Sequence, residues 1–115
     1  MPNQPNPVTN FDQVNINTSL QVGSGGPISA IEKFSPDLTP VAVAADTSAE
    51  QTFAVAGLNA GDTVVVNPQV AQTDGIGIVG VRVSAANTLA IMFSNSTAGA
   101  LTPAAGVYNV LRFAM

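Results

Sequence analysis

Apolar and polar residues alternate along most of the chain from Ile28 onward, which is the pattern of β-strands that bury one face. The alternation is clearest in residues 88–95, where Leu89, Ile91 and Phe93 fall on one face. Clusters of Gly, Asn, Asp and Pro interrupt it at intervals of roughly 8–12 residues, as turns do. The expected strands cover residues 28–34, 38–44, 51–56, 63–67, 75–84, 88–95 and 106–114. Seven short strands without a helix of useful length predict an all-β fold, a single β-sandwich or jelly-roll-like domain.

Two of these expected strands are apolar on both faces. Residues 75–84 carry Val79, Val81 and Val83 on one face and Ile76, Ile78 and Arg82 on the other. Residues 106–114 carry Val107, Leu111 and Phe113 opposite Tyr108 and Val110. Such a strand lies either at the centre of a buried sheet or at an interface between subunits. We favour the second for part of this surface, and expect a self-interface that includes Ile76, Ile78, Tyr108 and Val110.

Residues 1–27 differ in composition from the remainder and predict an extended arm that precedes a β-sandwich domain over 28–115. The arm is rich in Pro, Asn and Gly, which disfavour a helix, and its run Gly-Ser-Gly-Gly at 23–26 is expected to be a hinge. It also contains apolar residues, partly at the even spacing of a strand. We expect these to contact a partner: Phe11, Val14, Ile16, Leu20 and Val22. A terminus without a role is the alternative.

The low content of charged residues has the largest effect on the predicted function. Charged residues make up 9% of the 115 residues, against about 25% in an average soluble domain. A surface with so little charge suits a chain that packs against copies of itself or against a partner, although a neutral polar surface on a secreted or viral β-protein would look the same. Lys33, Arg82 and Arg112 are far apart in sequence, so neither nucleic acid nor an anionic membrane is an expected partner. Neither a transmembrane stretch nor a signal peptide is recognisable. If Met1 is the native start, this predicts synthesis in a cytosol; a cleaved precursor segment is the alternative.

The side chains that carry most enzyme chemistry are missing. The chain has no His and no Cys, which excludes Ser-His-Asp and Cys-His arrangements and zinc sites built on those residues. Its seven carboxylates fall mostly in expected turns, where Asp favours turn hydrogen bonds. A calcium site made by Asp46, Asp62 and Asp74 has no spacing motif behind it. The expectation is a protein that is not an enzyme and has no cofactor and no metal.

Four segments of the C-terminal half, residues 61–68, 80–89, 91–97 and 103–108, carry alternating strands with Asn and Gly turns. Over residues 45–113 the chain resembles a small β-sandwich module of tailed-phage virion proteins, which include head decoration (cement) and head-fibre proteins. The resemblance implies a jelly-roll-like domain, often a homotrimer, on the surface of a capsid. The arm is similar to the extended termini with which such proteins reach neighbouring subunits.

The expected function is therefore that of a virion structural protein, a capsid decoration or cement protein that binds and stabilises the phage head surface. Its partners would be copies of itself in a homotrimer and the major capsid protein or another virion protein. It would be made in the host cytoplasm and located on the capsid surface of the virion. The alternatives are a tail, fibre or baseplate structural protein and a glycan-binding adhesin-type module.

Overall fold

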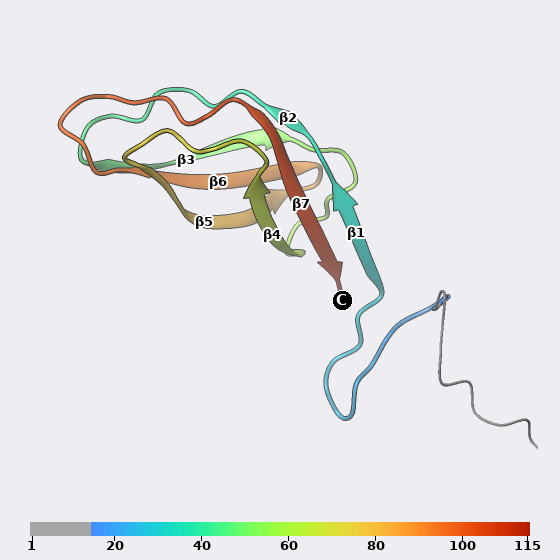
Figure 1. Cartoon of the computed structure of the whole chain (residues 1–115). Helices are drawn as coiled ribbons and strands as arrows, with labels where there is room; N and C mark the ends of the chain where they lie inside the picture. Colours follow the sequence, from blue (N-terminus) through green and yellow to red (C-terminus); the bar gives the residue numbers. More distant parts are fainter. Residues whose placement is uncertain (1–14) are drawn as a thin grey trace, which may run out of the picture.

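The computed structural model describes residues 15–115, so the predicted arm contacts Phe11 and Val14 lie outside the described residues. This part of the chain is all-β, and its two antiparallel sheets form a β-sandwich-like single domain (Figure 1). Its strands are β1 (Ala30–Phe34), β2 (Asp37–Leu38), β3 (Thr47–Ala54), β4 (Thr63–Pro68), β5 (Ile76–Ala85), β6 (Thr88–Asn95) and β7 (Gly106–Ala114). No segment within this part forms a helix that could span a membrane.

The first sheet is built around β7. Strands β1 and β2 follow one another along β7 in a single register, from Ala30 opposite Ala114 to Leu38 opposite Gly106. Strand β4 also pairs with β7, antiparallel, with Val65 opposite Leu111. Strand β7 is therefore a central strand, which explains why the sequence is apolar on both of its faces.

The second sheet has the order β3-β6-β5. In β6 the side chains of Leu89, Ile91 and Phe93 are fully buried, as the alternation predicts. The tight turn between β5 and β6 contains Asn87 at a φ of 57°, a conformation that Asn adopts more readily than most residues. The Asn87 side-chain oxygen accepts a hydrogen bond of 2.9 Å from the backbone N–H of Gly57, which ties this turn to the β3–β4 connection.

Strand β5 departs from the simple alternation expected for it. The pairing of β5 with β6 shifts register between Ile78 and Gly80, which is the signature of a β-bulge. The extra residue, Val79, is exposed, whereas Ile76 and Val83 are both buried. The prediction that Val79 and Val83 share a face opposite Ile76 was therefore wrong, because the bulge reverses the side-chain phase halfway along the strand.

The core lies between the two sheets. The buried hydrophobic cluster comprises Leu38, Val43, Val55, Leu58, Ile76, Val83, Leu89, Ile91, Phe93, Tyr108 and Val110. Ile78 is partly buried and packs against this cluster. The predicted self-interface of Ile76, Ile78, Tyr108 and Val110 was therefore wrong, because these side chains already pack inside a single copy and are not free for a second one.

The core also contains polar groups, and their hydrogen bonds are complete. The Tyr108 hydroxyl donates to the carbonyl oxygen of Ala104 (2.7 Å) and accepts from Nε2 of Gln72 (3.1 Å). Throughout residues 15–115, every buried side-chain nitrogen or oxygen has a hydrogen-bond partner. Burial of these groups therefore carries no penalty for unsatisfied polar atoms.

Of the strand expected over residues 38–44, only Leu38 lies in a strand, the two-residue β2. Beyond it, Val43 forms an isolated bridge with Leu101. Pro40 lies in this segment and has no backbone N–H to donate to a ladder. A side chain takes over part of the pairing: the Val41 N–H donates to Oε1 of Gln51 (2.9 Å), and Nε2 of Gln51 donates to the Val41 carbonyl (2.8 Å).

A short hairpin precedes β1 and projects from the end of the first sheet (Figure 1). Leu20 and Ile28 pair antiparallel and exchange two backbone hydrogen bonds of 2.8 and 2.7 Å. The Gly25 N–H donates to the Val22 carbonyl at 3.1 Å. Residues 23–26, expected to be a hinge, thus form the turn of this hairpin.

Candidate protein-binding surface

The outward face of the first sheet is apolar at the end next to the hairpin. The register places two rows of residues across β1, β7 and β4, namely Ile31, Phe113 and Thr63 in one row and Lys33, Leu111 and Val65 in the next. Residues directly opposite one another in paired strands share a face. Ile31 and Val65 are exposed and Leu111 and Phe113 half-buried, so these side chains line solvent rather than the core. We call Ile31, Val65, Leu111 and Phe113 the apolar face.

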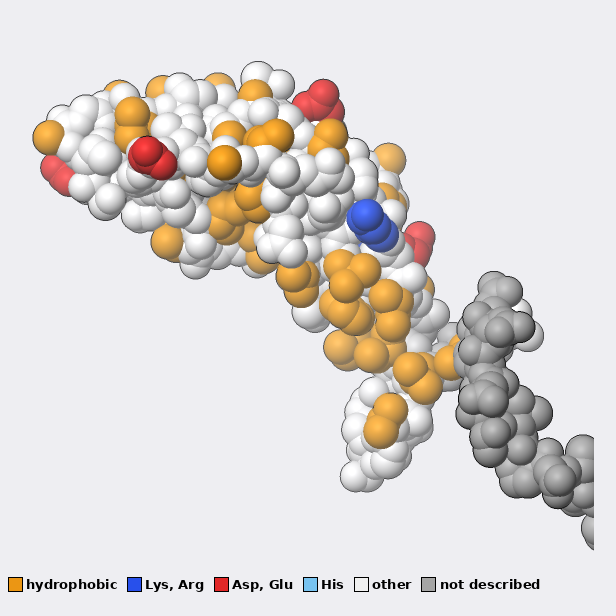
Figure 2. Space-filling view, viewed as in Figure 1, with side chains coloured by type: hydrophobic (Ala, Val, Ile, Leu, Met, Phe, Trp, Pro, Cys, Tyr) orange, Lys and Arg blue, Asp and Glu red, His pale blue; other side chains and the backbone are white. Residues whose placement is uncertain are grey.

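The apolar face has a definite limit along the sheet. In the following row, Asn109 of β7 lies opposite Asn67 of β4. Oδ1 of Asn109 accepts hydrogen bonds from the Ser35 hydroxyl (3.2 Å) and from Nε2 of Gln69 (2.9 Å). The outward surface is therefore polar toward β2 and apolar toward the hairpin, where Figure 2 shows hydrophobic side chains gathered.

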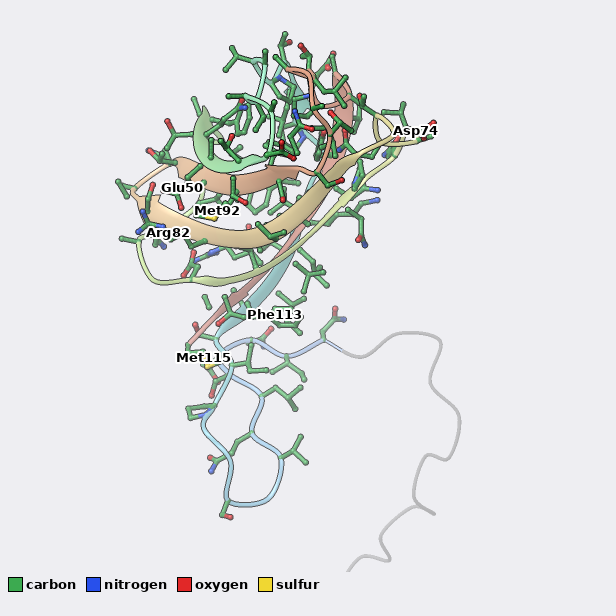
Figure 3. All side chains as sticks on the ribbon, turned by 90° about the vertical axis from the view of Figure 1, so that its left-hand side faces the viewer. Glu50, Asp74, Arg82, Met92, Phe113 and Met115 are labelled. Carbon is green, nitrogen blue, oxygen red and sulfur yellow. The ribbon has the colours of Figure 1, made fainter. Side chains whose placement is uncertain are left out.

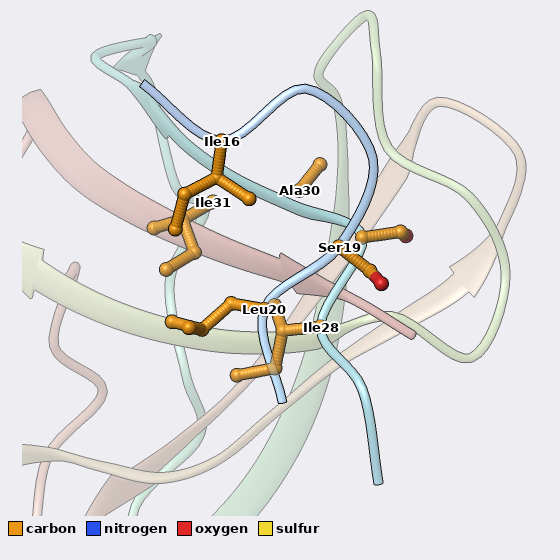
Figure 4. A pocket seen from close by; sticks show the side chains of 7 residues that line it. Ile16, Ser19, Leu20, Ile28, Ala30 and Ile31 are labelled. Atoms are coloured by element: carbon orange, nitrogen blue, oxygen red, sulfur yellow. The ribbon is translucent and has the colours of Figure 1, made fainter. Parts of the chain in front are cut away.

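A groove of about 260 Å³ lies between the hairpin and β1 and continues this surface (Figure 4). Its lining consists of aliphatic side chains and two serines, namely Ile16, Ser19, Leu20, Ile28, Ser29, Ala30 and Ile31. Ile31 belongs to both the groove and the apolar face. The two features are therefore one continuous apolar surface that extends from β4 to the hairpin.

Three of the five predicted arm contacts lie on or beside this surface. Ile16 and Leu20 line the groove, and Val22 is highly exposed on the hairpin just before its turn. Neither Ile31 nor Val65 was predicted from the sequence to belong to an interface. The alternation within residues 63–67 and 106–114 does indicate an outward apolar face, because it separates Val65 and Phe113 from the side chains that face the core.

A charged cluster on the inner side of β7 holds this surface in place. Nε of Arg112 donates a hydrogen bond to Oδ2 of Asp62 at 2.5 Å, and its NH1 group contacts the carboxylate of Glu32 on β1. The side chains of Arg112 and Asp62 are each 9% exposed. The hydrogen bond from Arg112, with a second one from the Asn59 N–H, lowers the pKa of Asp62 below its usual value. The same bond raises the pKa of Arg112, so the cation persists at all ordinary pH values.

A second ion pair lies on the outward face of the other sheet. Arg82 of β5 donates two hydrogen bonds, of 2.9 and 2.8 Å, to the carboxylate of Glu50 on β3. The Glu50 and Arg82 side chains thus reach across β6, close to Met92 (Figure 3). The hydrogen bond from Arg82 lowers the pKa of Glu50. The Arg82 side chain is 63% exposed, so solvent screens this pair much more than the pair of Arg112 with Asp62.

The three carboxylates considered for a calcium site do not converge. Asp46 and Asp74 precede β3 and β5, whose first residues both pair with Asn95 and so lie at one end of the second sheet. Asp62 is instead bound to Arg112 of the first sheet. Within residues 15–115 there is no group of three or more acidic side chains that could hold a metal ion. The calcium site considered from the sequence therefore has no counterpart in this part of the chain.

No protein-family model, no curated protein and no solved structure matches the chain.

Proposed function

We propose that this chain is a virion structural protein, a capsid decoration or cement protein that binds and stabilises a phage head surface without catalysis. The observation that carries the protein-binding part is the continuous apolar surface formed by the apolar face and the groove. Contiguous apolar patches of this kind on a soluble domain commonly mark sites of protein association. The phage part rests on the resemblance of residues 45–113 to tailed-phage virion modules.

The proposed mechanism is burial of apolar area. Each square ångström of apolar surface removed from water contributes about 25 cal/mol. A few hundred square ångströms per copy would therefore give a substantial contact, and repetition over a symmetric shell would multiply its effect through avidity. Lys33 is the one charged residue in the two rows that contain the apolar face, so a partner that covers these rows would have to desolvate only one charge there.

A surface for glycans has less support. Sugar rings usually stack on exposed aromatic side chains. Among residues 15–115, Phe93 and Tyr108 are fully buried, and Phe113, the aromatic residue of the apolar face, is half-buried. The aliphatic character of the groove and the apolar face favours a protein partner.

Mass spectrometry of gradient-purified virions from the phage that encodes this chain tests the proposal. We expect its peptides in the virion at a copy number comparable to that of the major capsid protein. A few copies per particle would instead indicate a tail, fibre or baseplate protein. If the chain is abundant in infected cells and missing from purified virions, the proposal is wrong.

A further inference from the structure

The exposed apolar side chains are concentrated at one end of the molecule. Ten large hydrophobic residues are strongly exposed in residues 15–115, and six of them belong to this end: Ile16, Leu20, Val22, Ile31, Val65 and Met115. Figure 3 shows Met115 beside Phe113 on the side of the hairpin. The other four, Val41, Val70, Val79 and Met92, are distributed over the rest of the domain. This asymmetry points to a single interface rather than to a generally apolar surface.

The hairpin supplies a second, independent observation. A hairpin of two strands is at best marginally stable in water unless it packs against something. This one is closed by a single pair, Leu20 with Ile28, and its residue Val22 is 79% exposed. Among residues 15–115, the apolar support of the hairpin is therefore limited to the side chains that line the groove next to β1.

We propose that a second copy of this chain covers this surface: the apolar face and groove of one copy pack against the same region of the other, and each hairpin lies across its partner. Every copy carries both parts that the contact requires, a projecting hairpin with an exposed valine and an apolar groove next to it. The cores of homomeric interfaces are apolar and poor in charge, and the two rows of the sheet contribute one charge, Lys33.

The surface is spread over several elements of the domain. Three strands, the hairpin and the C-terminal residue all contribute to it. Such a breadth is in keeping with a specific interface, which removes roughly 800 Å² of surface from each partner. The inference rests on the proposed function and narrows it, since it names a second copy of this chain, rather than the capsid protein, as the occupant of this surface. It can fail separately, because self-association needs no virion.

Light scattering of the full chain over a range of concentrations tests the inference. We expect an oligomer for the unmodified chain. Ile31→Lys and Val22→Lys should each weaken association by at least roughly tenfold, because both place a charge in an apolar contact. Val79→Lys is the matched control, since Val79 is 59% exposed and Ile31 53%, yet Val79 lies on the other sheet. Val22 lies on the projecting hairpin outside the core, so its variant keeps the test valid even if Ile31→Lys fails to fold.

Two results would overturn the inference. One is an unmodified chain that remains a monomer up to about 1 mM, which would leave the surface to a different protein. The other is an oligomer that neither Ile31→Lys nor Val22→Lys weakens more than Val79→Lys does, which would place the self-interface elsewhere. A chain that forms the expected oligomer and is missing from virions would contradict the proposed function and leave this inference intact.

Discussion

Replacement of Arg112 by methionine is expected to lower the Tm by roughly 10 °C, because it leaves the carboxylate of Asp62 buried without its cation. Arg112 is 8% exposed and connects β7 to Glu32 of β1 and to Asp62 before β4. Arg82→Met is the matched control, since Arg82 also pairs with a carboxylate but is largely exposed. It should change the Tm by less than about 3 °C.

Thermal unfolding followed by circular dichroism measures both variants. Asp62→Asn in the Arg112→Met background should recover part of the loss, because the uncompensated charge is then removed. If Arg112→Met and Arg82→Met lower the Tm equally, the buried cluster contributes no more than an exposed pair, and the account of how β1 is held against β7 is wrong.

The pH dependence of stability follows from the same cluster. The pKa of Asp62 is lowered in the folded state, so the folded state binds fewer protons than the unfolded state near that pKa. The stabilisation is therefore present above the unfolded pKa of about 3.9 and is lost as the pH falls through the lowered value. Below about pH 4 the Tm of the unmodified chain should fall more steeply than that of Arg112→Met.

Replacement of Asn95 by alanine is expected to lower the free energy of unfolding by about 3 kcal/mol. Asn95 is 1% exposed at the end of β6. Its Nδ2 donates to the carbonyls of Val43 (3.0 Å) and Gly99 (2.9 Å), and its Oδ1 accepts from the N–H (2.9 Å) and the hydroxyl (2.7 Å) of Thr97. The alanine variant removes all four bonds and leaves a cavity where two loops meet.

Urea unfolding measures this loss, with Asn109→Ala as the control. Asn109 accepts side-chain hydrogen bonds on the outward face of the first sheet, where water can replace them, and its loss should cost less than about 1 kcal/mol. Equal losses for the two variants would contradict the role given to Asn95.

Because Asn95 is buried, it is also unsuited to modification in the folded chain, although Asn95-Ser96-Thr97 matches a glycosylation sequon.

The sequence predicted much of the fold because short-range alternation determines most of these strands. It identified the buried face of β6 through Leu89, Ile91 and Phe93. The prediction failed where a single residue changes the alternation of side chains along a strand or the backbone pairing between strands. The bulge at Val79 and the replacement of strand pairing by Gln51 opposite Val41 depend on tertiary neighbours, which a sequence window of a few residues does not contain.

The candidate surface was harder to predict than the fold. Side chains that are apolar on both faces of β7 fit both a buried central strand and a subunit interface, and register decides between them. That register places Tyr108 and Val110 in the core and leaves Phe113 beside Ile31 on the outside. The low charge and the apolar arm residues drew attention to apolar side chains such as Val22, which is exposed, but they did not indicate which sheet face lies next to them.

Amide hydrogen exchange of the unmodified chain, compared at about 1 μM and about 500 μM, tests most directly whether this surface is an interface between copies of the chain. The account predicts that exchange in residues 19–34, the hairpin and β1, becomes slower at the higher concentration, while exchange in β3 and β5 stays the same. Slowing confined to β3 or β5, or no dependence on concentration anywhere in the chain, would contradict it.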